Sequence, residues 1–136
     1  MWELTGEQDE WCTTTHGESG LTAEVIASKT TPEQAPNALL EYIKKFVPEK
    51  GRGVLAGNSV HCDKAFLRKE PYKQVIDHLH YRIFDVSSLK IAAGLWSEEA
   101  VRRGVPVKRN FHKANEDILE SIAEARYYKE AIYQRP

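Results

Sequence analysis

The sequence contains little cysteine and no long apolar run. Cys12 and Cys62 are the only two cysteines in 136 residues, which is too few for a disulfide framework, so we expect free thiols in a reducing compartment. No apolar stretch approaches the roughly 20 residues that a membrane-spanning helix needs, and we predict no membrane span. The N-terminus lacks the basic and apolar succession of a secretory signal. We therefore expect an intracellular location.

An excess of charge of one sign is also lacking. The net charge is −1, with 29% charged and 41% hydrophobic residues, which is the balance of a globular domain that folds in water. A protein that coats long nucleic acid needs a large positively charged face. The net charge therefore argues against such a protein and leaves a short or locally held nucleic acid as a possible ligand. Because neither repeats nor low-complexity linkers interrupt the chain, we expect a single domain over residues 1–136.

Apolar residues recur at helical spacing in some segments and form short runs in others. In chain order, the predicted elements are a helix over residues 31–47, a strand over 53–57, a helix over 60–69, a strand over 81–86, a helix that Ser87 or Ser88 caps, and a helix over 114–128. The inner face of the helix after residue 86 is expected to carry Leu89, Ala92, Ala93 and Trp96. Thr31 and Gln34 fit a capping box at the first helix. Strands that alternate with helices indicate the α/β class, in which ligands bind beyond the carboxyl ends of the strands.

Two polar motifs stand where such a site is expected. G-N-S-V-H-C-D ends at Asp63, and H-K-A-N-E-D runs from His112 to Asp117. Two carboxylates can hold a hard divalent cation such as Mg²⁺, and a histidine can take a proton from attacking water. The plainer interpretation stays open, because a carboxylate at a helix start is often only favoured by the helix dipole.

These motifs resemble those of the oligoribonucleases, which belong to the histidine-containing DEDD exonucleases. The resemblance covers nearly the whole chain, through D-E-W-C-T-T-T-H-G-E-S-G-L, G-N-S-V-H-C-D, H-Y-R-I-F-D-V-S-S-L-K and H-K-A-N-E-D-I in this order. It implies a ribonuclease-H-like exonuclease fold, here with a reduced central sheet flanked by helices. It also implies a 3′→5′ exoribonuclease that hydrolyses short oligoribonucleotides to 5′ mononucleotides with Mg²⁺ or Mn²⁺.

The resemblance assigns roles to particular residues. Asp63 and Asp117 would be metal-ligating carboxylates, and His112 the general base. The implied substrate contacts are Trp11, which would stack on a base, His16, Ser59, and the group of Tyr81, Arg82 and Ser87. A second subunit would contribute that last group to the 5′ side of the RNA. The resemblance thus implies a homodimer, in the cytoplasm or the mitochondrion.

The first strand of the family carries an Asp-x-Glu pair inside a D-x-E-M-T-G-like motif. This sequence opens M-W-E-L-T-G, so Glu3 would be the remaining metal ligand while Met1 occupies the place of the aspartate. Two-metal catalysis needs carboxylates around both ions, so we expect impaired activity in this form. The alternative is a non-catalytic protein that binds short RNA or dimerises. Missing strands would also leave an open sheet edge and an uncovered apolar face.

Other interpretations of the same residues are possible. Trp11 and Tyr81 can be core aromatics, and Arg82 a surface ion-pair partner. Zinc binding by cysteines 12 and 62 with histidines 16 and 61 fits none of the usual ligand spacings, so we expect buried thiols instead. The glutamates of the last helix, Glu124 among them, look like a solvated charged face.

Overall fold

The computed structural model describes residues 10–107 and 114–133, without the side chains of residues 10–12 and 133. Its elements, in chain order, are α1 (Glu10–Glu18), α2 (Leu21–Ala27), α3 (Gln34–Phe46), β1 (Leu55–Gly57), α4 (Val60–Leu67), α5 (Lys73–His78), β2 (Ile83–Asp85), α6 (Val86–Trp96), α7 (Glu99–Arg103), α8 (Ala114–Tyr128) and the π-helical turn η1 (Lys129–Tyr133). The described part of the chain is thus mostly helical, with a small sheet.

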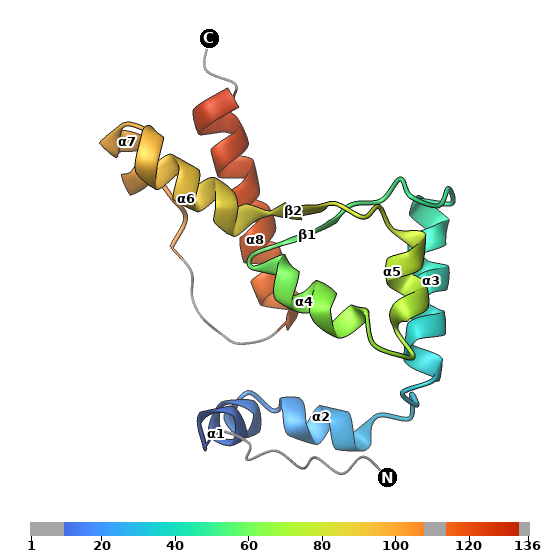
Figure 1. Cartoon of the computed structure of the whole chain (residues 1–136). Coiled ribbons are helices and arrows are strands. Elements are labelled where there is room, and N and C mark those ends of the chain that lie inside the picture. The colour runs from blue at the N-terminus through green and yellow to red at the C-terminus, as the bar shows by residue number, and fades with distance from the viewer. Residues whose placement is uncertain (1–9, 108–113, 134–136) are drawn as a thin grey trace.

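The two strands pair in parallel near the middle of the molecule (Figure 1). Leu55 pairs with Ile83, and Gly57 pairs with Asp85. Two backbone hydrogen bonds extend this pairing ahead of the strands, from His80 N to Gly53 O at 2.7 Å and from Gly51 N to His78 O at 2.8 Å. Because parallel strands end at the same edge, β1 and β2 deliver the residues that follow them to one place.

Helices surround this small sheet. Helix α4 contacts both strands, and α8 contacts β1 and α6. Figure 1 shows α3 and α5 packed together at one end of the molecule and α6, α7 and α8 at the other, whereas α1 and α2 pack on each other apart from the sheet. The expectation of an α/β fold with a reduced sheet flanked by helices is confirmed.

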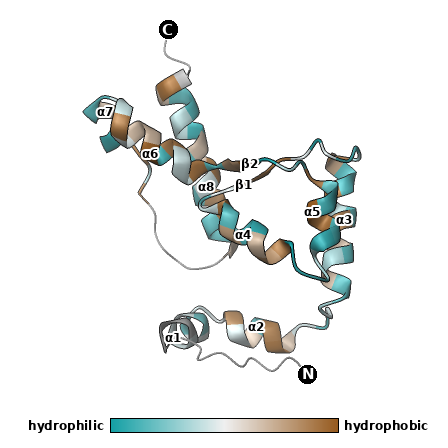
Figure 2. Ribbon diagram, in the orientation of Figure 1, coloured by the Kyte–Doolittle hydropathy of each residue, from teal (hydrophilic) through white to brown (hydrophobic). Residues whose placement is uncertain are grey.

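The core is small for a chain of this length. Val86, Ala93 and Tyr128 form its central cluster, where α6 meets α8. Many large apolar side chains remain exposed on the described elements, including Phe66 at 72% and Trp96 at 82%. Figure 2 shows hydrophobic residues on several of the helices. We expected Trp96 on the inner face of its helix, and that prediction is wrong because no described element covers this side of α6.

Local signals in the sequence predicted several boundaries well. The capping box forms as expected, since Thr31 N donates to Gln34 Oε1 at 3.0 Å and Gln34 N donates to Thr31 Oγ1 at 3.2 Å. The last long helix also spans its predicted residues. The cap of α6 differs from the prediction, because the Asp85 carboxylate, rather than Ser87 or Ser88, accepts the hydrogen bond at the helix start.

Candidate active site

The turn between β1 and α4 is held in an unusual backbone conformation. Ser59, the residue before α4, has φ 52° and ψ 32°, in the left-handed region. A side chain other than glycine is rare there and persists only where surrounding contacts favour it. Those contacts are present, because Ser59 N donates to Asp85 Oδ1 and to Ser87 Oγ, at 3.0 Å in each case.

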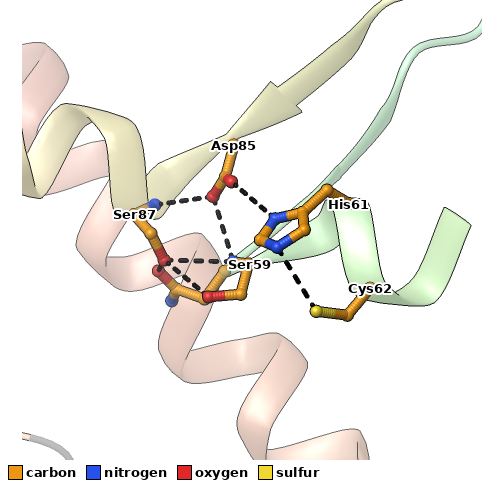
Figure 3. Close-up of polar contacts among 6 residues, drawn as sticks. Ser59, His61, Cys62, Asp85 and Ser87 are labelled. Carbon is orange, nitrogen blue, oxygen red and sulfur yellow. Dashed lines mark hydrogen bonds and ion pairs between the residues drawn. The ribbon is translucent and has the colours of Figure 1, made fainter. Parts of the chain in front are cut away.

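Asp85 links the ends of the two strands. Its Oδ1 accepts hydrogen bonds from Ser87 N at 2.9 Å and from Ser59 N at 3.0 Å. Its Oδ2 lies 3.5 Å from His61 Nδ1, whose ring is otherwise largely exposed. Figure 3 shows these side chains converging on Asp85 from the start of α4 and the start of α6. One largely buried carboxylate therefore organises both turns.

Asp63 and Asp117 line the same cavity. Asp63 lies in the first turn of α4, and Asp117 in the first turn of α8. The cavity has a volume of about 950 Å³ and an apolar side that includes Phe84, Ile118 and Ile122. The structure thus brings together two of the three residues on which the nuclease hypothesis depends, from segments far apart in the sequence.

The donor set in this cavity suits a hard cation. Asp63 and Asp117 offer carboxylate oxygens, and Mg²⁺ is often held by one or two carboxylates together with water and substrate phosphates. Among residues 10–107 and 114–133, no group of three or more His, Cys, Asp and Glu side chains is placed to hold one ion. The two aspartates therefore offer the type of oxygen that such an ion prefers.

Glu124 is a polar residue of this region that sequence reasoning misassigned. We expected it on a solvated face, but it is only 1% exposed. Its Oε2 accepts from Asn58 Nδ2 at 3.0 Å, and its Oε1 accepts from Tyr128 OH at 3.4 Å. Burial raises the pKa of Tyr128 to about 12, and the nearby Glu124 carboxylate adds to the shift. No local signal in the sequence reveals this burial, because Asn58, the partner of Glu124, is 66 positions away in the chain.

The structure separates the expected substrate contacts into two sets. Ser59 and Ser87 lie together beyond the carboxyl ends of the strands, with their hydroxyl oxygens 3.4 Å apart. Tyr81 and Arg82 come just before β2, at its other end, where both are exposed and the Arg82 guanidinium lies 5.2 Å from the Tyr81 ring. Ser87 is therefore not grouped with Tyr81 and Arg82 within one chain.

The remaining predicted site residues take less part in the described geometry. His112 and Glu3 lie outside the described residues, as does the side chain of Trp11, which belongs to α1. His16, also on α1, is half-buried and does not line the cavity. Cys62 is exposed, with its Sγ 3.4 Å from His61 Nε2, so the expectation of a buried thiol is wrong at this position.

Comparison with known proteins gives the class of protein. A family model described as "Exonuclease" matches residues 5–125. The chain is 46% identical to "Oligoribonuclease, mitochondrial" of Saccharomyces cerevisiae over 134 residues, which is 98% of this chain and 49% of that protein. It is 43% identical to an oligoribonuclease of Arabidopsis thaliana, covering 94% of this chain and 56% of that protein.

A bacterial relative is covered more fully. The chain is 41% identical to the oligoribonuclease of Francisella tularensis over 131 residues, which is 96% of this chain and 70% of that protein. The chain therefore belongs to the oligoribonuclease family of exonucleases, as its motifs indicated. It spans about half the length of the yeast relatives. None of the described helices is long and apolar enough to cross a membrane.

Proposed function

We propose that this chain forms part of a 3′→5′ exoribonuclease that hydrolyses short oligoribonucleotides to 5′ mononucleotides. The observation that carries the proposal is the shared cavity of Asp63 and Asp117, which lies beside the paired turns at the carboxyl ends of the strands. Membership of the oligoribonuclease family supports it, as do the names of the relatives. The family match favours this enzyme over a non-catalytic RNA-binding protein.

Asp63 and Asp117 would hold Mg²⁺ or Mn²⁺, which supplies Lewis-acid charge to a phosphodiester and acidifies water. We assign to His112 the removal of a proton from the attacking water, as a histidine of near-neutral pKa allows. Ser59 would donate a hydroxyl hydrogen bond to a phosphate oxygen, beside Ser87, whose hydroxyl donates to Asn58 Oδ1. The apolar side of the cavity, with Phe84 and Ile118, would exclude water from the bound nucleotide.

We also propose that the enzyme is a homodimer and works in the cytoplasm or the mitochondrion. Tyr81 and Arg82 lie at the other end of β2 from Ser87, so a second copy would bring them to the 5′ side of an RNA bound at the cavity, with Trp11 and His16 as further contacts. The proposed compartment is supported by the mitochondrial name of the yeast relative.

The test of catalysis is cleavage of a 5′-labelled diribonucleotide with Mg²⁺ or Mn²⁺. We expect release of labelled 5′ mononucleotide, and a loss on the order of 10² to 10⁴ in rate for Asp63→Asn or Asp117→Asn, the cost of removing a positioned catalytic group. Asp77→Asn is the matched control, because Asp77 is an exposed aspartate of α5 that pairs with Lys73 and does not line this cavity. Dinucleotide binding without cleavage would instead identify a binding protein.

Mixing two inactive variants tests the dimer. If a second copy supplies Arg82, then Asp63→Asn and Arg82→Ala are each inactive, but a mixture contains heterodimers with one intact site. We expect the mixture to regain part of the activity, and light scattering of the wild type to give twice the mass of the chain. Additive behaviour of the two variants, with a monomeric mass, would exclude a shared site.

A further inference from the structure

The buried side chain of Glu124 points to a role beyond packing. A carboxylate removed from water is costly unless hydrogen bonds replace its hydration. Glu124 is 1% exposed on α8, in contact with donors from two parts of the chain. Replacing it by an apolar residue would avoid this cost, so the polar contacts themselves have a use in the fold.

Asn58 connects Glu124 to the two strand-end turns. Its Nδ2 donates to Glu124 Oε2 and to Ser121 Oγ, at 3.0 Å in each case. Its Oδ1 accepts from Ser87 Oγ at 3.1 Å. The single amide therefore ties α8 to the turn after β1 and to the start of α6.

Ser121, which accepts from Asn58, also connects this network to the candidate metal ligand Asp117. Ser121 Oγ donates to Asp117 O at 2.8 Å, one turn earlier on the helix. Asp117 and Glu124 are about two helical turns apart and share a face of α8. When Glu124 holds Asn58, the rotation of α8 about its axis is fixed relative to the turn that leads to Asp63.

We propose that Glu124 is a positioning residue of the nuclease site. Its carboxylate holds the Asn58 amide, and so keeps Asp117 on α8 and Asp63 on α4 directed into one cavity. The inference rests on the proposed function, because the metal that the two aspartates would share belongs to it. Outer residues that orient metal ligands typically change metal affinity about 10- to 100-fold when they are replaced.

The test measures Mn²⁺ binding by electron paramagnetic resonance, without substrate, beside the melting temperature of each variant. In Glu124→Gln one acceptor oxygen becomes an amide donor, so either the bond from Asn58 Nδ2 is lost or the Tyr128 hydroxyl must reverse its own bond. In Asn58→Asp two carboxylates face each other. We expect each change to weaken Mn²⁺ binding about 10- to 100-fold. The double variant Asn58→Asp/Glu124→Gln restores a hydrogen bond between these two positions, with donor and acceptor exchanged. We expect it to regain most of the Mn²⁺ affinity.

Val75→Ala is the control for stability. Val75 is a buried residue of α5 away from this network, so the variant should lower the melting temperature and leave the Mn²⁺ affinity unchanged. Ser121→Ala removes one acceptor of Asn58 and leaves the carboxylate in place, so it tests the network even if Glu124→Gln does not fold, and we expect a loss of several-fold.

The outcomes separate the two proposals. If Glu124→Gln and Ser121→Ala behave like Val75→Ala, with a lower melting temperature and wild-type Mn²⁺ affinity, Glu124 is only structural and the proposed function stands. Absence of rescue in the double variant would also contradict a direct coupling of Asn58 to Glu124. If the wild type binds no Mn²⁺, the proposed metal site fails and the positioning role fails with it.

Discussion

The hydroxyl oxygens of Ser59 and Ser87 lie 3.4 Å apart, although 28 positions separate the two residues in the sequence. Ser59 lies in the turn after β1, and Ser87 lies in the first turn of α6, directly after β2. Ser59 N donates to Ser87 Oγ at 3.0 Å. The pairing of β1 with β2 therefore builds a two-hydroxyl surface next to the cavity of Asp63 and Asp117. This surface is small enough to contact a single phosphate group.

Replacing Ser87 by alanine should weaken this surface more than it weakens the fold. Ser87 Oγ accepts from Ser59 N and donates to Asn58 Oδ1, so its loss should lower the free energy of unfolding by about 0.5–1.5 kcal/mol. Dinucleotide binding should weaken as well. Urea unfolding and a binding titration measure the two effects. Ser88→Ala, at an exposed neighbouring position, is expected to change neither, and equal effects of both variants would contradict the assignment.

Two replacements of Asp85 should separate the contribution of its negative charge to stability from that of its hydrogen-bond acceptor oxygen. Asp85→Ala removes the acceptor for Ser59 N and Ser87 N, and loss of a helix cap together with a buried acceptor should cost about 1–3 kcal/mol of unfolding free energy. Asp85→Asn keeps one acceptor oxygen and should cost less. The order wild type, Asn, Ala in urea unfolding is the expected result. An alanine variant as stable as the wild type would show that the two turns do not depend on Asp85.

Two glycines should respond to alanine in opposite directions. A Cβ at Gly104 would lie 2.3 Å from the hydroxyl of Tyr127, whose hydrogen bond to Val101 O at 2.6 Å would then break. Gly104→Ala should therefore lower the unfolding free energy by about 1–2 kcal/mol. Gly94 lies inside α6 with open space around it, so Gly94→Ala should raise stability by up to about 1 kcal/mol. Thermal unfolding of both variants decides the point.

Stability at high pH should depend on Tyr128. Its pKa in the folded protein is raised from 10.0 to about 12, so folding favours the neutral phenol. The resulting stabilisation is complete below pH 10, where the unfolded tyrosine is also neutral, and is lost as the pH rises from 10 towards 12. A shift of this size corresponds to roughly 2–3 kcal/mol. Tyr128→Phe should show a smaller loss of unfolding free energy over this pH range, and parallel profiles would contradict the shift.

The elements that the sequence predicted correctly depend on neighbours close in the chain. The Thr31 and Gln34 capping box is a contact over three positions, and the apolar spacing of residues 114–128 is also local. The carboxyl ends of the strands were likewise predictable, because short apolar runs ended by polar residues indicate buried strands. For the same reason Asp63 and Asp117 could be singled out as candidate ligands before their common cavity was known.

What the sequence did not predict depends on distant partners. The burial of Glu124 requires Asn58, which is 66 positions away, and no local pattern shows that pairing. Helix α5 (Lys73–His78) is too short to produce a clear apolar period. Trp96 was expected to be buried because an apolar helix face normally finds a partner, and the described residues do not provide one.

No connecting residue separates β2 from α6, since the strand ends at Asp85 and the helix begins at Val86. The strand therefore continues directly into the helix. Asp85 belongs to the last residue pair of the sheet and is also the N-cap of α6. Sliding β2 along β1 by a single position would reverse the side of the sheet to which Asp85 points. The hydrogen bond from Ser59 N to the Asp85 carboxylate would be lost at the same time. A register error in this small sheet therefore cannot leave the turn after β1 and the start of α6 intact.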